Sequence, residues 1–310
     1  MDVENYKIER GNNSTEYFLN IADFIIKIFF EDKNISNIDL LPSLDIFRTD
    51  NNKNCNLLFD LSVIELLPDI SFSYKHIGTF DTGNGDTIIY AYTNGDYKFV
   101  IKDIDGNISC ELLTNAIFSK CLCRLNGDVK IKRFGLNNAL MMAFAFAGSL
   151  KETLLIHASS IHKDGYGYAF IAKSGTGKST HTGLWIKNIS HCDLLNDDNP
   201  IIRFINNVPY LYGSPWSGKT PCYRNIKTKL GAITRIERAE TNYIKKLKPT
   251  DAFASILPCC STMKWDKNIY NAICNNVIKV IEKVNVYTLY CLPNKNAAFI
   301  CHNQISRQKI

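Results

Sequence analysis

A glycine-rich segment near the middle of the chain has the residue types and spacing of a phosphate-binding loop. Its two glycines let successive backbone N–H groups turn toward one phosphate, and the helix expected after it adds the positive end of its dipole. In such a loop Lys178 reaches the β- and γ-phosphates, and the Ser179 hydroxyl is a Mg²⁺ ligand. The segment fits the Walker A pattern with alanine in place of the first glycine, and it predicts ATP and Mg²⁺ as cofactors. The residues expected to bind them are Lys173, Ser174, Gly175, Thr176, Gly177, Lys178, Ser179 and Thr180.

Two adjacent carboxylates, Asp197 and Asp198, follow the expected helix and a short strand over residues 192–195. An acidic residue at the end of a neighbouring strand holds Mg²⁺ in many phosphate-loop proteins. Two carboxylates allow one to bind the metal while the other takes the proton from an attacking hydroxyl. We expect Asp198 to join Ser179 at the metal, although the sequence leaves open which carboxylate is the base. Aspartate before Asn-Pro is also a good turn former, which is the structural alternative.

His157 is expected near the mouth of the glycine-rich segment. If residues 154–162 and 168–172 form an antiparallel hairpin around Asp164-Gly165, then His157 lies opposite residues 172–174. A histidine there could orient an aspartate or contact the transferring phosphate, so we include it with Asp197, Asp198 and Lys178 as catalytic. A half-buried strand histidine without a catalytic role is the alternative.

A second loop, residues 213–221, combines small residues, two prolines, a tryptophan and a lysine. This composition favours a substrate loop, in which Trp216 is an exposed-type residue and Lys219 and Arg224 offer positive charge to a phosphoryl group or an acidic substrate. An ordinary surface loop is the alternative. His181, on the first turn of the helix after the glycine-rich segment, is a weaker candidate for contact with metal or substrate.

The elements around these residues predict an α/β protein in two domains. Residues 1–133 read as β-rich, with a hairpin at Asn94-Gly95 between two β-branched and aromatic runs. A helix is expected from Leu136 to Leu150 with Asn137 or Asn138 as its cap, and the domain boundary just before it. Residues 134–310 alternate strands and helices, including a hairpin that turns at residues 206–207.

Composition limits the classes of function. The chain has 310 residues, a formal net charge of +6 and scattered basic residues without a long run, so we expect no nucleic-acid partner. No stretch reaches the length of a membrane span, and residues 1–10 do not resemble a signal peptide. Eleven cysteines without paired CxxC spacing suggest free thiols rather than disulfides or a zinc site. We therefore expect a cytoplasmic protein without a membrane partner.

The residues 157–159, 174–179 and 196–198 together resemble the catalytic domain of the HPr kinase/phosphorylase family, whose superfamily includes the ATP-dependent phosphoenolpyruvate carboxykinases. Similar uncharacterised bacterial HPr-kinase-like proteins carry the sequence GSPWSGKTP, found here at residues 213–221. The resemblance covers residues 154–230 well and implies a phosphate-loop domain with a mixed sheet and a β-hairpin before the loop. It also implies that the matching side chains, Lys178, Ser179, Asp197, Asp198 and His157, form the active site.

The resemblance implies an ATP- and Mg²⁺-dependent kinase acting on a serine or threonine hydroxyl of a protein or peptide. The chain departs from the family at Thr180-His181, where the kinase has glutamate after the serine, and the glycine-rich signature linked to phosphorylase activity is not visible. Phosphorylase activity and HPr as the substrate are therefore not implied. The alternatives are a kinase for a small hydroxylated acceptor such as free serine, a nucleotide-binding regulatory protein with little catalysis, and a carboxykinase-type enzyme. Related folds form oligomers, so a homo-oligomer stays open.

Overall fold

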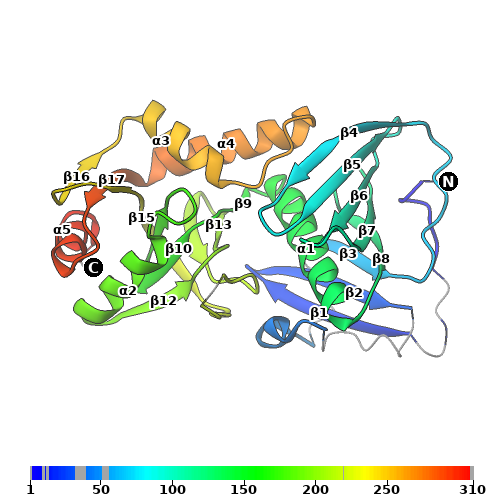
Figure 1. The fold of residues 1–310 in the computed structure, drawn as a ribbon, viewed down its shortest axis with the longest axis horizontal. Coiled ribbons are helices and arrows are strands. Elements are labelled where there is room, and N and C mark those ends of the chain that lie inside the picture. The colour runs from blue at the N-terminus through cyan, green and yellow to red at the C-terminus, as the bar shows by residue number, and fades with distance from the viewer. Residues whose placement is uncertain are drawn as a thin grey trace. The chain divides into compact units, whose positions relative to one another are not determined.

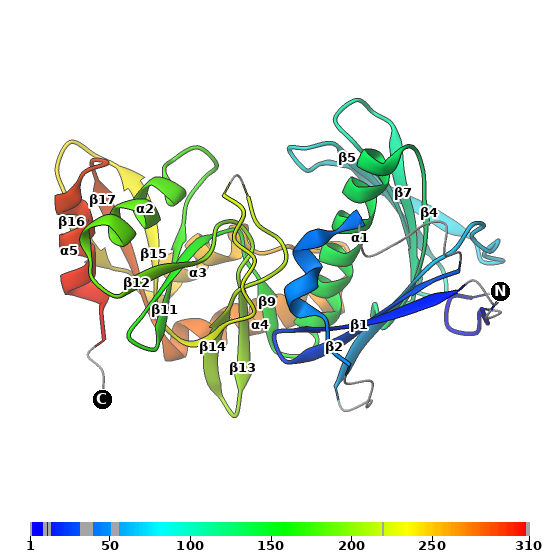
Figure 2. The same ribbon diagram turned by 90° about the horizontal axis from the view of Figure 1, so that it is seen from below.

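The computed structural model describes residues 2–8, 11, 14–31, 40–50, 56–218 and 220–307. The chain divides into two compact units, Met1–Gly148 and Ser149–Ile310. Each unit has its own β-sheet, and each sheet mixes parallel and antiparallel strand pairs. The chain is thus an α/β protein whose N-terminal part is rich in β-structure (Figures 1 and 2).

The sheet of the first unit has the strand order β1-β2-β3-β8-β7-β6-β5-β4. β2, β3 and β8 run parallel to one another, and the other neighbours are antiparallel. The hairpin expected at Asn94-Gly95 is confirmed between β5 and β6, where Gly95 has a φ of 94°. The strands are β1 Thr15–Ile21, β2 Phe24–Phe30, β3 Leu57–Val63, β4 Tyr74–Asp81, β5 Asp86–Tyr92, β6 Tyr97–Lys102, β7 Ile108–Thr114 and β8 Lys120–Leu125.

Helix α1 (Val129–Ser149) lies along one face of this sheet (Figures 1 and 2). It begins before the expected Leu136, and the carboxylate of Asp128 caps it by accepting a 2.9 Å hydrogen bond from the N–H of Ile131. Neither Asn137 nor Asn138 is the cap. The basic residues and the glycine of its first two turns hide the helical pattern in the sequence. The ring of Phe144 packs on Phe24 of the same unit, so the two units divide after this helix, whereas the sequence placed the domain boundary before it.

The sheet of the second unit runs β12-β10-β11-β15-β14-β13-β9, and β17 adds to β15 and carries β16. β15 is long enough to pair with β14 near its start and with β17 near its end, along the same edge. The strands are β9 Thr153–Leu155, β10 Ser159–Lys163, β11 Tyr166–Ile171, β12 Cys192–Asn196, β13 Ile201–Ile205, β14 Val208–Tyr212, β15 Lys227–Arg238, β16 Tyr243–Lys246 and β17 Asn285–Cys291.

Four α-helices cover this sheet among the described residues. Trp185 of α2 and Cys301 of α5 belong to one buried cluster on one face, with Phe170 and Leu289 from the strands. Figure 1 shows α3 and α4 on the opposite side of the sheet from α2. The helices are α2 Lys178–Asn188, α3 Pro249–Ile256, α4 Lys267–Lys283 and α5 Lys295–Ile305, and the 3-10 helix η3 Leu257–Cys259 follows α3.

One expectation for this unit is met and one is wrong. The hairpin of β13 and β14 turns at Asn206 and Asn207, which both have positive φ as asparagine tolerates. The single strand expected over residues 154–162 is instead two strands, β9 and β10, which pair with different partners. The chain leaves the sheet between them because the N–H of Ile156 and Ala158 bind the carbonyls of Pro200 and Asp198.

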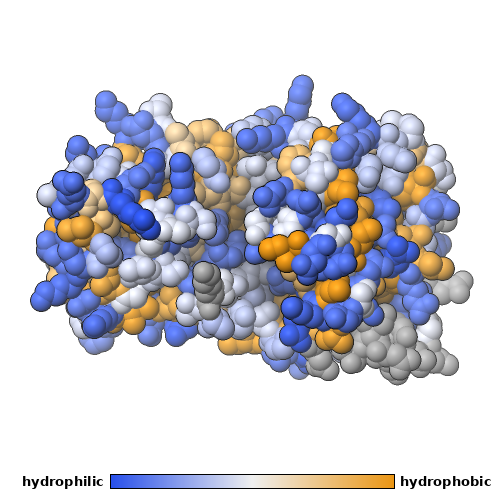
Figure 3. All heavy atoms as spheres, in the orientation of Figure 1, coloured by the Kyte–Doolittle hydropathy of each residue, from blue (hydrophilic) through white to orange (hydrophobic). Residues whose placement is uncertain are grey.

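No α-helix in the described ranges is both long and apolar enough to cross a lipid bilayer. The face of the molecule in Figure 3 is mostly hydrophilic, with hydrophobic residues scattered over it in small groups.

We predict opposite effects for two glycine-to-alanine changes in helices. A Cβ at Gly135 of α1 would come within 2.6 Å of the Ser109 carbonyl oxygen, whereas a Cβ at Gly183 of α2 meets no atom within 4 Å. Gly135→Ala should lower the free energy of unfolding by about 1–3 kcal/mol through overpacking. Gly183→Ala should raise it by about 0.5–1 kcal/mol through helix propensity. Urea unfolding of both variants checks this, and stabilisation by Gly135→Ala would contradict the packing of α1.

Candidate functional site

The glycine-rich loop, residues 172–177, joins the end of β11 to the start of α2. Gly175 and Gly177 have positive φ values of 74° and 127°, so both positions need glycine. No side chain caps the N-terminus of α2 at Gly177, and a Cβ at Gly175 would meet no atom within 4 Å. The loop therefore offers the uncapped end of a helix beside open space, and Lys173, Ser174, Ser179 and Thr180 are exposed around it.

Arg238 holds this loop, although no local motif in the sequence marks it. Its guanidinium donates to the carbonyl oxygens of Gly175 at 2.6 Å and Thr176 at 3.2 Å. Arg238 is the last residue of β15, which pairs in parallel with β11, so the ends of the two strands meet at one edge of the sheet. The parallel pairing of these strands was the missing signal, because it brings residues far apart in sequence together.

His157 lies in the break between β9 and β10. The register of β10 and β11, with Ser159 opposite Phe170, is the one that the sequence argument used. The backbone N–H of His157 donates to the carbonyl of Cys259 at 2.7 Å, so the residue is anchored to the end of η3 rather than to a strand. The side chain is 45% exposed, which leaves the imidazole accessible to a ligand.

Lys178, His157 and Asp198 form one polar row. The Nζ of Lys178 lies 2.9 Å from His157 Nε2, and His157 Nδ1 lies 3.1 Å from Asp198 Oδ1. Because an ammonium group can only donate, Nε2 is the acceptor, and the ring proton sits on Nδ1 and points at the carboxylate. Burial lowers the pKa of Lys178, and the charge of Asp198 is the largest of the influences that oppose this. The row places a cation, an imidazole and a carboxylate in sequence beside the glycine-rich loop.

Asp197 is the buried member of the acidic pair, with 6% of its surface exposed, while the Asp198 side chain is 32% exposed. The Oδ1 of Asp197 accepts a 2.7 Å hydrogen bond from the Ser159 hydroxyl, and that hydroxyl lies 3.0 Å from the Thr182 hydroxyl. Thr182 in turn donates to the carbonyl of Ser179 at 2.9 Å. Asp197 is therefore linked to the first turn of α2, whereas Asp198 faces Lys178 through His157.

The fully buried side chain of Asn196 fixes the turn that carries both carboxylates. Its Oδ1 accepts from the backbone N–H of Asp198 at 2.9 Å and of Asn199 at 2.8 Å. Its Nδ2 donates to Ser214 Oγ and to the carbonyl of Trp216, each at 3.1 Å. One amide thus connects the acidic turn to the 213–221 loop.

The 213–221 loop packs against the acidic turn through its backbone. A Cβ at Gly218 would come within 2.9 Å of the carbonyl oxygen of Asp197, so only glycine fits there. Trp216 was expected to be exposed, but it is buried with 3% of its surface accessible, because the loop folds inward over Asn196. Lys219 lies outside the described residues.

Arg224 is not brought to the acidic pair. Its Nη1 lies 3.3 Å from His162 Nε2 and 3.9 Å from Asp193 Oδ2, three residues before Asn196 on β12. Its charge is thus directed to an exposed aspartate at the other end of the strand. Arg224 follows the 213–221 loop closely in sequence, which suggested a position beside the acidic pair. The chain instead carries its side chain to Asp193 and His162.

His181 is a core residue rather than a metal or substrate contact. It is 2% exposed, its ring packs edge-on against Phe170 at 4.8 Å, and its Nε2 accepts a 3.0 Å hydrogen bond from the indole of Trp185. Burial lowers the pKa of this histidine to about 4. The imidazole is therefore neutral at physiological pH and cannot reach the loop side of α2.

No group of three or more His, Cys, Asp or Glu side chains within the described ranges is arranged to hold a metal ion. A divalent cation at this site would therefore draw oxygen ligands from hydroxyl groups and from a bound phosphate as well as from a carboxylate. Magnesium binding through one or two protein oxygens plus phosphate oxygens fits this donor set.

Comparisons with known proteins find a likeness to solved structures only, and it is distant. No protein-family model matches the chain, and no curated protein matches it. The structure of the Hpr(Ser) kinase/phosphatase from Coxiella burnetii is similar to 48% of this chain and 91% of its own, with 12% sequence identity and a TM-score of 0.29. A likeness at this level is a distant structural relationship only.

We predict that His181 makes stability depend on pH. An unfolded histidine titrates near 6.5 and the folded one near 4, so the unfolded chain binds the proton more tightly. The stability from burying the neutral ring is complete above about pH 6.5 and is lost as the pH falls toward 4. Between pH 7 and pH 5 this should remove about 2 kcal/mol of the free energy of unfolding. Denaturant titrations of wild type and His181→Phe check it, because the variant should lose less, and equal losses would contradict the assignment.

Proposed function

We propose that the chain is an ATP- and Mg²⁺-dependent kinase that phosphorylates a serine or threonine hydroxyl of a protein or peptide. The observation that carries this proposal is the row of Lys178, His157 and Asp198, held by hydrogen bonds beside an uncapped helix N-terminus. A cation for the phosphates and an accessible carboxylate for the proton of the hydroxyl are groups that many phosphotransferases use, and the imidazole would orient the carboxylate.

In this proposal the glycine-rich loop binds the triphosphate. The open space at Gly175 and the uncapped N–H groups at the start of α2 suit phosphate oxygens, and the exposed Ser179 hydroxyl suits a magnesium ion. Bound ATP with Mg²⁺ would supply the phosphoryl group to be transferred. Lys178 would leave His157 and turn its ammonium group to the phosphates, which releases Nε2 of the imidazole.

The contacts favour separate roles for the two carboxylates. Asp198 is the more exposed one, so we assign it to the proton of the acceptor hydroxyl, with Nδ1–H of His157 orienting its Oδ1. Asp197, linked to the first turn of α2 through Ser159 and Thr182, lies on the side of Ser179, and we assign it to the metal. This assignment replaces Asp198, which the sequence had favoured as the partner of Ser179 at the metal.

The proposal predicts which carboxylate matters for transfer. With labelled γ-phosphate of ATP and Mg²⁺, the wild type should label one fraction of a serine- and threonine-containing peptide library. Asp198→Asn should lower the transfer rate about 10²- to 10⁴-fold with ATP binding retained, since a general base contributes that much. Asp197→Asn should instead reduce the extent to which added Mg²⁺ strengthens ATP binding.

Asp193→Asn is the matched control for these variants, because it changes an exposed aspartate on β12, the strand that leads to the acidic pair, away from the site. Wild-type transfer by Asp198→Asn would refute its role as the base. Label on free serine alone would make the chain a small-molecule kinase. Binding of ATP without label in any acceptor would make a nucleotide-binding regulatory protein the better account.

Arg238 should support nucleotide binding through the loop that it holds. Without its guanidinium the carbonyls of Gly175 and Thr176 lose their donor, and the loop loses part of its fixed shape. We expect Arg238→Ala to raise the KM for ATP about threefold to tenfold with a smaller change in kcat, a loss of about 0.7–1.4 kcal/mol. Arg235→Ala, whose side chain bonds Ser255 instead, is the control. Equal effects of the two substitutions would show that Arg238 has no special role.

A further inference from the structure

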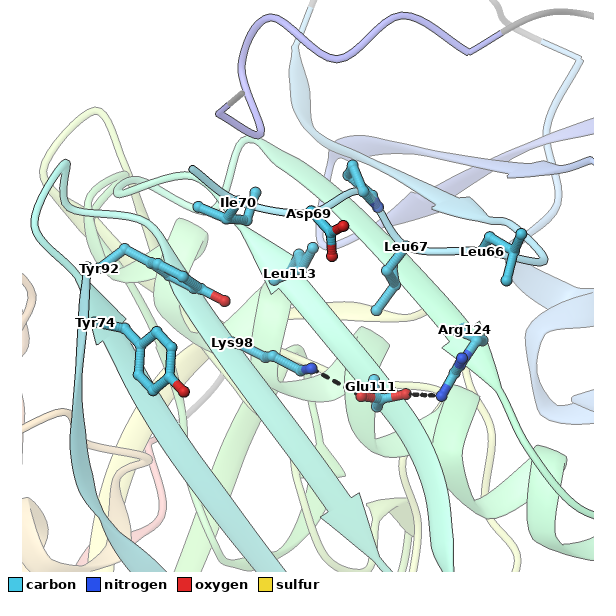
Figure 4. A pocket seen from close by; sticks show the side chains of 11 residues that line it. Leu66, Leu67, Asp69, Ile70, Tyr74, Tyr92, Lys98, Glu111, Leu113 and Arg124 are labelled. Carbon is cyan, nitrogen blue, oxygen red and sulfur yellow. Dashed lines mark hydrogen bonds and ion pairs between the residues drawn. The ribbon is translucent and has the colours of Figure 1, made fainter. Parts of the chain in front are cut away.

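A cavity of about 330 Å³ opens on one face of the sheet in the first unit (Figure 4). The loop after β3 forms one wall, and side chains of five neighbouring strands, β4 to β8, form the rest. The volume lies at the lower end of the range for small-molecule sites, so the cavity fits a compact ligand. Nothing in the proposed kinase chemistry uses it.

The floor of the cavity is a row of charges on three adjacent strands. The Nζ of Lys98 on β6 lies 2.8 Å from the carboxylate of Glu111 on β7, which also pairs with Arg124 on β8 (Figure 4). Burial alone would raise the pKa of Glu111, but hydrogen bonding by Lys98 and the charges of Lys98 and Arg124 lower it below its usual value. Glu111 is therefore ionised, and the three groups together carry one net positive charge.

Both cations keep hydrogen-bond donors for a ligand. Lys98 has three N–H donors, of which Glu111 takes one. The guanidinium of Arg124 has five N–H donors on a side chain that is 39% exposed, and its contact with Glu111 is made by Nη2. A floor with surplus positive charge and unused donors suits one carboxylate. A dianionic phosphate group fits less well, because Glu111 lies between the two cations.

The wall facing this floor has the opposite character. Figure 4 shows the carboxylate of Asp69 and the hydroxyl of Tyr92 directed into the cavity. The rings of Tyr74 and Tyr92 meet edge-on at 5.7 Å. An aspartate beside tyrosine rings suits an ammonium group, through ion pairing and through the electron-rich ring faces.

Apolar side chains complete the cavity and fix its wall. Leu67, Ile70 and Tyr92 pack on a small core that contains Ile64 and Leu113. The loop after β3 is thus held to the sheet, so the site is formed before a ligand arrives. Preorganised walls reduce the entropy lost on binding.

From this arrangement we propose that the cavity binds a free α-amino acid with a large apolar or aromatic side chain. Its carboxylate would accept hydrogen bonds from Lys98 and Arg124, its ammonium group would face Asp69, and its side chain would lie against Leu67, Ile70 and the tyrosines. The positively charged floor and the negatively charged Asp69 on the facing wall, with an apolar surface between them, select a zwitterion over a simple acid or amine. This site is independent of the proposed kinase activity.

Isothermal titration of the full chain tests the proposal with leucine, phenylalanine and tyrosine. Leucinamide, which lacks the carboxylate, and 4-methylpentanoate, which lacks the ammonium group, are the matched probes, and N-acetylated leucine distinguishes a free amino acid from a peptide end. We expect at least one of the three amino acids to bind and each matched probe of leucine to bind about tenfold more weakly.

Two variants place the binding in this cavity. Asp69→Asn changes an exposed loop residue and Arg124→Lys keeps the positive charge, so both should fold, and each should weaken binding of the amino acid about tenfold. Asp105→Asn, an exposed aspartate in the turn between β6 and β7, is the control and should bind as the wild type does. The proposal is overturned if none of the three amino acids binds at millimolar concentration, or if binding is the same in both variants as in the wild type.

Discussion

The side chain of Asn196 is the constraint on which the arrangement of the site depends. It is fully buried at the end of β12, and its amide makes hydrogen bonds to two segments, the acidic turn and the 213–221 loop. Its oxygen holds the turn of Asp197 and Asp198, and its nitrogen holds the loop at Ser214 and Trp216. A buried amide with all of these partners in place rigidifies its surroundings, because leaving any partner unsatisfied would cost free energy. Aspartate in its place would lack the two N–H donors that the loop requires.

The electrostatics of the site follow from where the two carboxylates can point. One is turned inward and satisfied by hydroxyl groups, and the other is partly exposed and paired with an imidazole. The ammonium group of Lys178 completes the row and offsets the negative charge of Asp198. Entry of an anion at the glycine-rich loop would therefore compete with His157 for the same ammonium group.

The sequence was informative where the signal is local. The glycines of the loop and the hairpin at Asn206-Asn207 could be predicted, because turn chemistry acts over a few residues. Residues 154–162 look like one strand, since nothing local reveals that the chain must leave the sheet at His157. Arg238 could not be selected at all, because only the pairing of β11 with β15 brings it to the loop. The burial of Trp216 was set by tertiary packing and could not be predicted from its residue type.

The break between β9 and β10 has a consequence for how remote parts of the second unit are connected to the site. The backbone of His157 bonds to the carbonyl of Cys259, while its neighbours bond to Pro200 and Asp198. The end of η3 therefore fixes the position of the His157 backbone, although η3 contributes no charged group to the row. A displacement of α3 along its axis would reach His157 through the three residues of η3 and one hydrogen bond. The second unit thus contains a short mechanical linkage from an outer helix to the middle of its polar row.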